Sequence, residues 1–321
     1  MRFTRIACVL ICALALPGLA VATPLVPGEI LVLGSSAAGD GIIRVDPGSG
    51  DQTLLASSGT AAFTDFAVTG DGDLFATTAD AVVQVDPMTG VRTTISSGGS
   101  IVDPIGIVAH AGALFVLTAT EIVRVDVGTG VQTSVSSGGF IGDPRDLGVD
   151  ASGDLIALDT VFLGGRGLEL FTIDILTGDQ TLIPALAASL PDPSGLGVAD
   201  SGELLVSDFS QAQTVGAVDP ITGNVLPATQ SALVISTDTL VLDVAVDADG
   251  RLLIPVLVVG GPDLLVRAQA GGPGTEILTE GLFREVEVVP GSPVPEPTAA
   301  FLFGAGLLVA RGAVRRRAPV R

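Results

Sequence analysis

A seven-residue pattern, with aspartate third and glycine last, recurs along this chain and constrains its fold more than any other feature. The five clear copies occupy residues 44–50, 84–90, 124–130, 172–178 and 217–223. Their aspartates, at positions 46, 86, 126, 174 and 219, are 40, 40, 48 and 45 residues apart, and a degraded sixth copy lies at 267–274. Self-similarity at this period indicates a series of equivalent supersecondary units.

The residues of the pattern are those of a tight turn. The aspartate accepts hydrogen bonds from backbone amides, a proline presets φ in three copies, and the last glycine supplies a positive φ. A polar, alternating run such as 91–95 follows the turn. Each copy therefore predicts a hairpin between two strands.

A second motif, Gly-x-Leu or Gly-x-Ile, alternates with the first. Its six copies begin at Gly28, Gly72, Gly112, Gly153, Gly202 and Gly250. A short apolar strand precedes every copy except the first, so one repeat holds four strands in about 44 residues, the size of a propeller blade. We therefore expect residues 23–290 to form an all-β, six-bladed β-propeller.

The last segment of this body supplies the strand that the first repeat lacks. Residues 284–289 have the pattern of the missing strand, and Pro290 follows them. Pairing this strand with the first repeat would remove two sheet edges and close the ring.

The N-terminus has the features of an exported protein. Residues 1–22 combine Arg2 and Arg5, a short apolar run and an A-x-A site at Ala20 and Ala22. This is the pattern of a signal peptide for the Sec pathway, with cleavage after Ala22. The alternatives are a buried strand or a retained anchor. Both cysteines precede the cleavage site, so the mature chain should contain no thiol.

The C-terminus has three features in a fixed order. A proline-rich linker spans 291–297, residues 298–310 carry no charge, and a basic tail containing Arg315, Arg316 and Arg317 follows. The segment 298–321 is predicted to form a transmembrane helix with its arginines on the cytoplasmic side.

This end resembles the PEP-CTERM sorting domain. The resemblance rests on the apolar run, the arginine cluster and the motif Val294, Pro295, Glu296 and Pro297. It implies transient anchoring in the inner membrane, removal of the tail by an exosortase-type enzyme, and a final location at the cell surface or in an extracellular, polysaccharide-containing matrix. An ordinary membrane anchor is the alternative.

The charge distribution excludes one class of partner. Residues 6–310 contain eight arginines, no lysine and all 35 acidic residues, a formal charge of 8 − 35 = −27. Such a body repels nucleic acid and attracts divalent cations or basic partners. A purely solubilising role for the charge is the plainer interpretation.

The repeat unit also resembles NHL-type and SMP-30-like (gluconolactonase-like) propellers, best at 143–149 and 192–198. The innermost strand of a blade begins at the mouth of the central channel, about seven residues before the motif glycine. The residues there are Asp65, Ile105, Asp146, Gly195, Asp243 and, in the closing strand, Glu285.

Four of these six residues are carboxylates, which together predict a site for Ca²⁺ or another divalent cation. SMP-30-like enzymes hold a divalent metal near this place with Glu, Asn and Asp ligands. No matching asparagine is present among these six positions. Local charge balance by Arg145 and Arg284 is the alternative to metal binding.

Other candidate groups are predicted to be structural. Asp71, Asp73, Asp247 and Asp249 belong to turns. His110, the single histidine, should lie in a surface turn at the far end of its blade from the channel mouth, where it cannot act as the general base. Three functions remain open: a non-enzymatic surface or matrix protein that binds a ligand, a divalent-metal-dependent hydrolase of the lactonase type, and a structural matrix component with no defined ligand.

Overall fold

The structure, a computed structural model, describes most of the predicted propeller body. The described residues are 24–161, 167–184, 190, 192–199, 201–208, 215–224, 239–247, 249–258, 263–269 and 275–290. The predicted signal peptide, linker and transmembrane tail lie outside these residues, as does most of the sixth turn motif. Within the described residues, no helix is long and apolar enough to cross a membrane.

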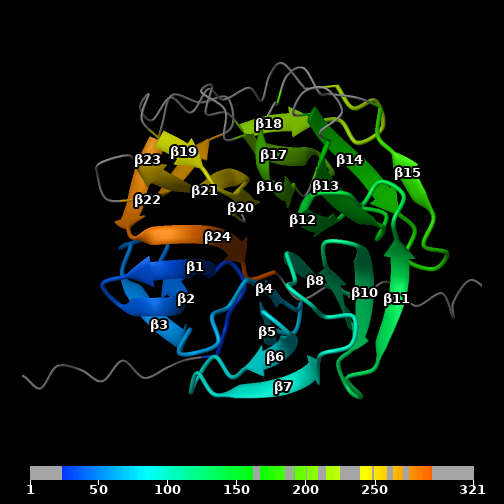
Figure 1. Ribbon diagram of the computed structural model, residues 1–321. Helices are drawn as coiled ribbons and strands as arrows, with labels where there is room; N and C mark the ends of the chain where they lie inside the picture. Colours follow the sequence, from blue (N-terminus) through cyan, green and yellow to red (C-terminus); the bar gives the residue numbers. More distant parts are fainter. Residues whose placement is uncertain are drawn as a thin grey trace, which may run out of the picture.

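Six antiparallel sheets stand around a common centre (Figure 1). Each sheet is one blade, and its innermost strand faces the axis. The first blade contains β24 (Leu282–Val288), β1 (Ile30–Ser36), β2 (Gly39–Val45) and β3 (Gln52–Ser57). The second contains β4 (Asp65–Val68), β5 (Leu74–Thr78), β6 (Ala81–Val85) and β7 (Arg92–Ser97). The third contains β8 (Gly106–His110), β9 (Ala113–Leu117), β10 (Glu121–Asp126) and β11 (Gln132–Ser137). The fourth blade contains β12 (Pro144–Val149), β13 (Leu155–Val161), β14 (Gly167–Ile173) and β15 (Gln180–Leu182). The fifth contains β16 (Pro193–Val198), β17 (Leu204–Asp208) and β18 (Val215–Val218). The sixth contains β19 (Thr239–Val241), β20 (Ala245–Val246), β21 (Arg251–Val258), β22 (Leu264–Gln269) and β23 (Thr275–Glu280). The predicted all-β, six-bladed fold is confirmed.

The predicted closure of the ring is also confirmed. Strand β24 pairs antiparallel with β1, with Ile30 opposite Val288 and Leu33 opposite Glu285. Main-chain hydrogen bonds from Gly28 N to Val289 O and from Val289 N to Glu29 O, both 2.9 Å long, extend the pairing. The end of the body thus supplies the innermost strand of the first blade.

The repeated turns behave as their sequence predicts. In the first turn, Asp46 Oδ1 accepts hydrogen bonds from Gly48 N at 2.8 Å and Ser49 N at 2.7 Å. The last residue of the third turn, Gly130, has φ +70°, and a Cβ there would overlap the carbonyl oxygen of Ile95 in the preceding blade. The motif glycine therefore makes both the turn and the close packing of neighbouring blades possible.

Side chains also join the outer strands of neighbouring blades. The Gln132 amide group of β11 donates to Ser96 Oγ and Gly98 O of the second blade and accepts from Ser100 N. Gln180 of β15 repeats these contacts one blade further on, with Ser136 Oγ, Gly138 O and Phe140 N. These repeated amide contacts fix the spacing of the blades at the rim.

The hydrophobic core is divided among the faces between blades. One cluster joins Leu74 of the second blade to Leu31 and Leu33 of the first, and another joins Phe115 of the third blade to Phe171 of the fourth. The apolar positions of each strand alternate toward its two neighbours, so every blade is buried on both faces. The result is a rigid ring that holds the six innermost strands around a central channel.

Candidate ligand channel

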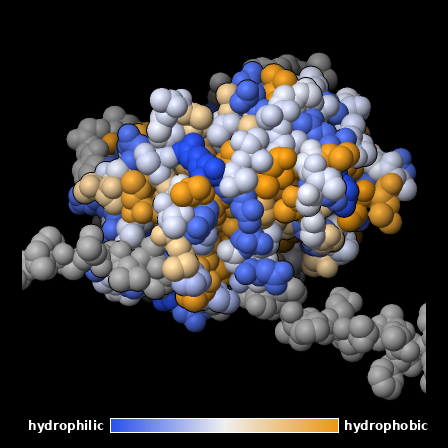
Figure 2. All heavy atoms as spheres, turned by 90° about the horizontal axis from the view of Figure 1, so that it is seen from below, coloured by the Kyte–Doolittle hydropathy of each residue, from blue (hydrophilic) through white to orange (hydrophobic). Residues whose placement is uncertain are grey.

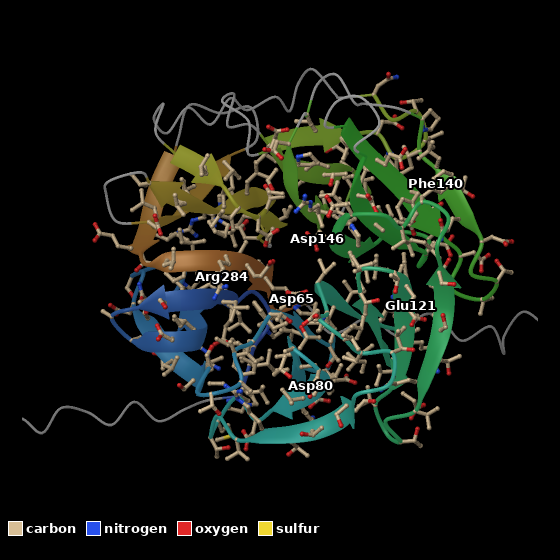
Figure 3. The ribbon with its side chains drawn as sticks, in the orientation of Figure 1. Asp65, Asp80, Glu121, Phe140, Asp146 and Arg284 are labelled. Atoms are coloured by element: carbon tan, nitrogen blue, oxygen red, sulfur yellow. The ribbon has the colours of Figure 1, made fainter. Side chains whose placement is uncertain are left out.

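A cavity of about 400 Å³ runs along the axis of the ring. It is lined by residues of all six innermost strands, including the four predicted carboxylates Asp65, Asp146, Asp243 and Glu285. Figure 3 shows Asp65 and Asp146 at the inner ends of their blades, around the centre of the ring. The structure therefore brings together the four acidic residues that the repeat register predicted.

The carboxylate of Asp65 joins two blades. Its Oδ1 accepts a hydrogen bond from the N–H of Phe66 at 2.7 Å, and its Oδ2 accepts one from the N–H of Ile107 at 2.6 Å. Phe66 lies on β4 of the second blade, whereas Ile107 lies on β8 of the third. One aspartate thus satisfies a main-chain donor on each side of the seam between these blades.

The same arrangement recurs at every second blade. Asp146 of the fourth blade accepts hydrogen bonds from Leu147 N at 2.7 Å and from Leu196 N of the fifth blade at 2.6 Å. Asp243 of the sixth blade accepts one from Val286 N of the closing strand at 2.9 Å. We refer to Asp65, Asp146 and Asp243, with the amides that they accept from, as the aspartate bridges.

The alternate blades carry different residues at the bridging position. Gly106, Gly195 and Glu285 occupy it in the third, fifth and first blades, as the strand registers show. At Gly195 a Cβ would lie 2.6 Å from Asp243 Oδ1, so the Asp243 carboxylate occupies the space that a side chain at this position would need. Glu285 is the exception, because it adds a fourth carboxylate to the ring.

The prediction of Ile105 at this position was wrong by one residue. Gly106 is paired with Leu117 as Asp65 is with Thr77. The third blade has a shorter inner turn, in which Ala111 and Gly112 both have positive φ, of 48° and 73°. Counting back seven residues from Gly112 therefore gives Ile105, one residue before the bridging position at Gly106.

Burial and mutual repulsion favour the protonated forms of these acids. Burial raises the pKa of Asp65 to about 7, against the lowering effect of its hydrogen bonds from Ile107 and Phe66. Burial, followed by the charges of Asp243 and Asp65, raises the pKa of Asp146 well above its ordinary range. Simultaneous ionisation of all the channel carboxyl groups is therefore disfavoured.

Glu285 is the member of the ring that is best suited to hold a proton. Burial first, and then the charges of Asp243, Asp65 and Asp146, raise the pKa of Glu285 well above its ordinary range. Its carboxyl group is hydrogen-bonded to the Asp243 side chain. Since Asp243 accepts the main-chain N–H of Val286, the physically consistent assignment gives the proton to Glu285, which donates to Asp243.

A fifth channel acid, Glu287, was missed by the sequence analysis. Its Oε1 accepts the N–H of Val68 at 3.3 Å, whereas its buried Oε2 has no hydrogen-bond partner among the described residues. Burial raises the pKa of Glu287 well above its ordinary range. The repeat register could have identified Glu287, because it is the one acid at a position that is otherwise uncharged. The equivalent residues of the other blades are Ala67, Val108, Gly148, Gly197 and Ala245.

The four predicted ligands Asp65, Asp146, Asp243 and Glu285 share one cavity, but they are not arranged as a preformed metal site. Within the part of the chain that the structure describes, no three His, Cys, Asp or Glu residues are arranged to hold a metal ion. The aspartate oxygens that would serve as ligands point instead at main-chain amides. The channel acids therefore act first as hydrogen-bond acceptors between blades.

The remaining predicted residues lie in turns at the other end of the innermost strands. His110 ends β8, and a Cβ at Gly153 in the neighbouring turn would lie 3.0 Å from its Nε2. Asp247 Oδ1 accepts hydrogen bonds from Asp249 N and Arg251 N, both at 2.9 Å. Asp73 accepts a hydrogen bond from the Gln84 side chain at 3.2 Å. These contacts agree with turn-forming roles.

Comparison with known proteins supports the fold alone. A chain from a crystal structure of a nidogen/laminin complex matches with a TM-score of 0.62 and 13% identity, over 80% of this chain and 97% of that one. A protein of unknown function from Bacteroides caccae matches with a TM-score of 0.60 and 13% identity, over 81% and 98%. No protein-family model and no curated protein matches this sequence.

Proposed function

We propose that this chain is an exported surface or matrix protein whose propeller binds a ligand or matrix component and catalyses no reaction. The observation that carries this proposal is the engagement of the aspartate bridges. Asp65 and Asp146 each use both carboxylate oxygens to accept main-chain N–H groups from two adjacent blades. A carboxylate held in this way is poorly placed to take a proton from a substrate or to attack one.

The solid outer surface suits binding by contact. Figure 2, which views the ring from its edge, shows polar and apolar side chains interspersed over the visible face. Non-obligate protein interfaces are about as apolar as the rest of a protein surface, so a mixed surface of this kind is compatible with binding by contact.

The two ends of the sequence support export and sorting. In this proposal the Sec pathway translocates the chain, the leader is removed after Ala22, and segment 298–321 anchors it transiently in the inner membrane. An exosortase-type enzyme then acts near the motif 294–297, and the acidic body reaches the surface or an extracellular polysaccharide matrix. The mass of the mature protein from its host tests this route. The expected species begins at Thr23 and lacks Arg321, whereas retention of Arg321 would indicate a plain anchor.

The binding role is tested on the body, residues 23–290, since these form a closed ring with its own core. The purified body would be screened against immobilised polysaccharides and surface proteins of its host. Saturable binding that survives the removal of divalent cations supports the proposal. Failure to bind any of them would favour a purely structural matrix component.

A divalent-metal-dependent hydrolase of the lactonase type is the second candidate. The observation that favours it is the convergence of Asp65, Asp146, Asp243 and Glu285 on one cavity. Calorimetry with Ca²⁺ on the body and on Asp146→Ala distinguishes the two proposals. Tight binding that the substitution abolishes, together with hydrolysis of a lactone, would establish the enzyme; absence of binding would remove its support.

A further inference from the structure

The carboxyl group of Glu287 lies beside several apolar side chains of the channel. Glu287 lines the cavity together with Val68, Val149, Val198 and Val246, which come from four other blades. Its counterparts in those blades are alanine or glycine. Packing between the blades does not require an acid at this position, since five blades close without one.

Glu287 is only partly satisfied by the protein. Val68 N donates to Oε1 at 3.3 Å, and Oε2 is buried with no hydrogen-bond partner among the described residues. A buried acceptor without a donor is unfavourable, because it has lost its hydrogen bonds to water. A ligand that carries an N–H or N⁺–H group would remove this cost.

The charge of the whole cavity favours a cationic ligand. The lining includes five acids, Asp65, Asp146, Asp243, Glu285 and Glu287, and no basic side chain. Glu285 lies two residues before Glu287 on the same strand, and therefore on the same face of it. A cation beside Glu287 would favour the ionised forms of both carboxyl groups on this face of β24.

The surroundings favour an organic cation over a metal ion. A divalent metal needs six or more oxygen ligands, and the valines around Glu287 offer none. An alkyl group, by contrast, gains free energy when contact with these side chains removes its apolar surface from water. The cavity volume of about 400 Å³ falls within the range of small-molecule sites.

We propose that the channel binds a small primary ammonium ion, with its charged nitrogen beside Glu287 and its alkyl chain along Val149, Val198 and Val246. This inference goes beyond the proposed function, because it concerns the channel and would hold whether or not the rim binds a matrix component. Failure of one proposal therefore leaves the other standing.

The test is titration calorimetry on residues 23–290 with n-butylammonium, using 1-butanol and Ca²⁺ as comparison ligands. Saturable binding of the ammonium ion is expected, with at least tenfold weaker binding of the alcohol. Glu287→Gln should weaken binding at least tenfold, and Glu287→Asp should weaken it less. Asp80→Asn, which changes an exposed acid, should leave the affinity unchanged.

Several outcomes would overturn the proposal. These are no saturable binding of n-butylammonium, equal binding of the alcohol, or unchanged affinity in Glu287→Gln. Binding of Ca²⁺ in place of the ammonium ion would assign the cavity to a metal instead. Circular dichroism of each variant, and the second variant Glu287→Asp, separate a loss of binding from a loss of folding.

Discussion

Asp243 Oδ2 accepts a hydrogen bond from the main-chain N–H of Val286 over 2.9 Å, and so joins the sixth blade to the strand that closes the first. β24 follows β23 of the sixth blade directly, so the pairing that joins the two ends of the body lies inside the first blade, between β24 and β1. Asp65 and Asp146 make equivalent bridges between blades two and three and between blades four and five. The three bridges divide the ring into three pairs of blades.

The first prediction concerns the stability that a bridge provides. Asp146→Ala leaves the buried N–H groups of Leu147 and Leu196 without their acceptor, although it also relieves the cost of burying a carboxyl group among other acids. We expect a net loss of about 2 kcal/mol in the free energy of unfolding, measured by urea denaturation of residues 23–290. Asp80→Ala is the exposed control and should change stability little. A more stable Asp146→Ala variant would show that burial of the charge outweighs the bridge.

The second prediction concerns pH. Burial raises the pKa of Asp65 to about 7 and raises the pKa values of Asp146, Glu285 and Glu287 well above their ordinary ranges. The folded state therefore binds more protons than the unfolded state once the pH exceeds the ordinary carboxyl range near 4. Stability should fall as the pH rises from about 4 through 7.

Urea denaturation at pH 5 and pH 8 measures this dependence. Wild type should be less stable at pH 8, and Glu285→Gln, which cannot ionise, should lose less stability over the same interval. A midpoint that rises from pH 5 to pH 8 would contradict the assigned direction of the shifts.

The third prediction concerns two turn glycines of the third blade, Gly130 in the outer turn and Gly112 in the inner one. Gly130 and Gly112 have similar φ values, +70° and +73°, but a Cβ at Gly130 would overlap Ile95 O whereas a Cβ at Gly112 meets nothing within 4 Å. Gly112→Ala should cost about 1–2 kcal/mol for the left-handed backbone alone. Gly130→Ala should cost about 1–3 kcal/mol more, because it also separates two blades. Equal losses in the two variants would indicate that the approach between blades is unimportant.

The fourth prediction concerns closure of the ring. A chain that stops at Gly281 lacks β24, so it exposes the edge of β1 and loses the buried side chain of Phe283, whereas a chain that stops at Pro290 keeps the ring complete. We expect the shorter chain to aggregate or to unfold at a much lower temperature. Calorimetric melting of the two chains would decide, and equal melting temperatures would contradict closure by β24.

The sequence predicted the architecture well because turn chemistry repeats. The six blades, the closing strand and the convergence of Asp65, Asp146, Asp243 and Glu285 all follow from two short motifs in a fixed order. The register was lost only in the third blade, where a two-residue turn at Ala111 and Gly112 replaces a longer one. The spacing between a motif and a site is reliable only while the intervening turn keeps its length.

The role of the channel acids could not be predicted in the same way. Several carboxylates at one mouth resemble a cation site, and only the folded structure shows that Asp65 and Asp146 accept main-chain N–H groups from the next blade. These donors are main-chain groups, so no particular residue type marks their positions in the sequence. Glu287 is not predicted in this way, because it lies two residues beyond the position at which the carboxylates of the repeats align.

Amide hydrogen exchange, resolved to single residues in the body 23–290, tests the central claim most directly. If the channel aspartates join the blades, Asp65→Ala should accelerate exchange at Ile107, Asp146→Ala at Leu196 and Asp243→Ala at Val286, each variant exposing its own partner amide. If exchange at these three amides stays as slow as in wild type, the aspartates do not bridge the blades, and their grouping in the channel would need a different explanation.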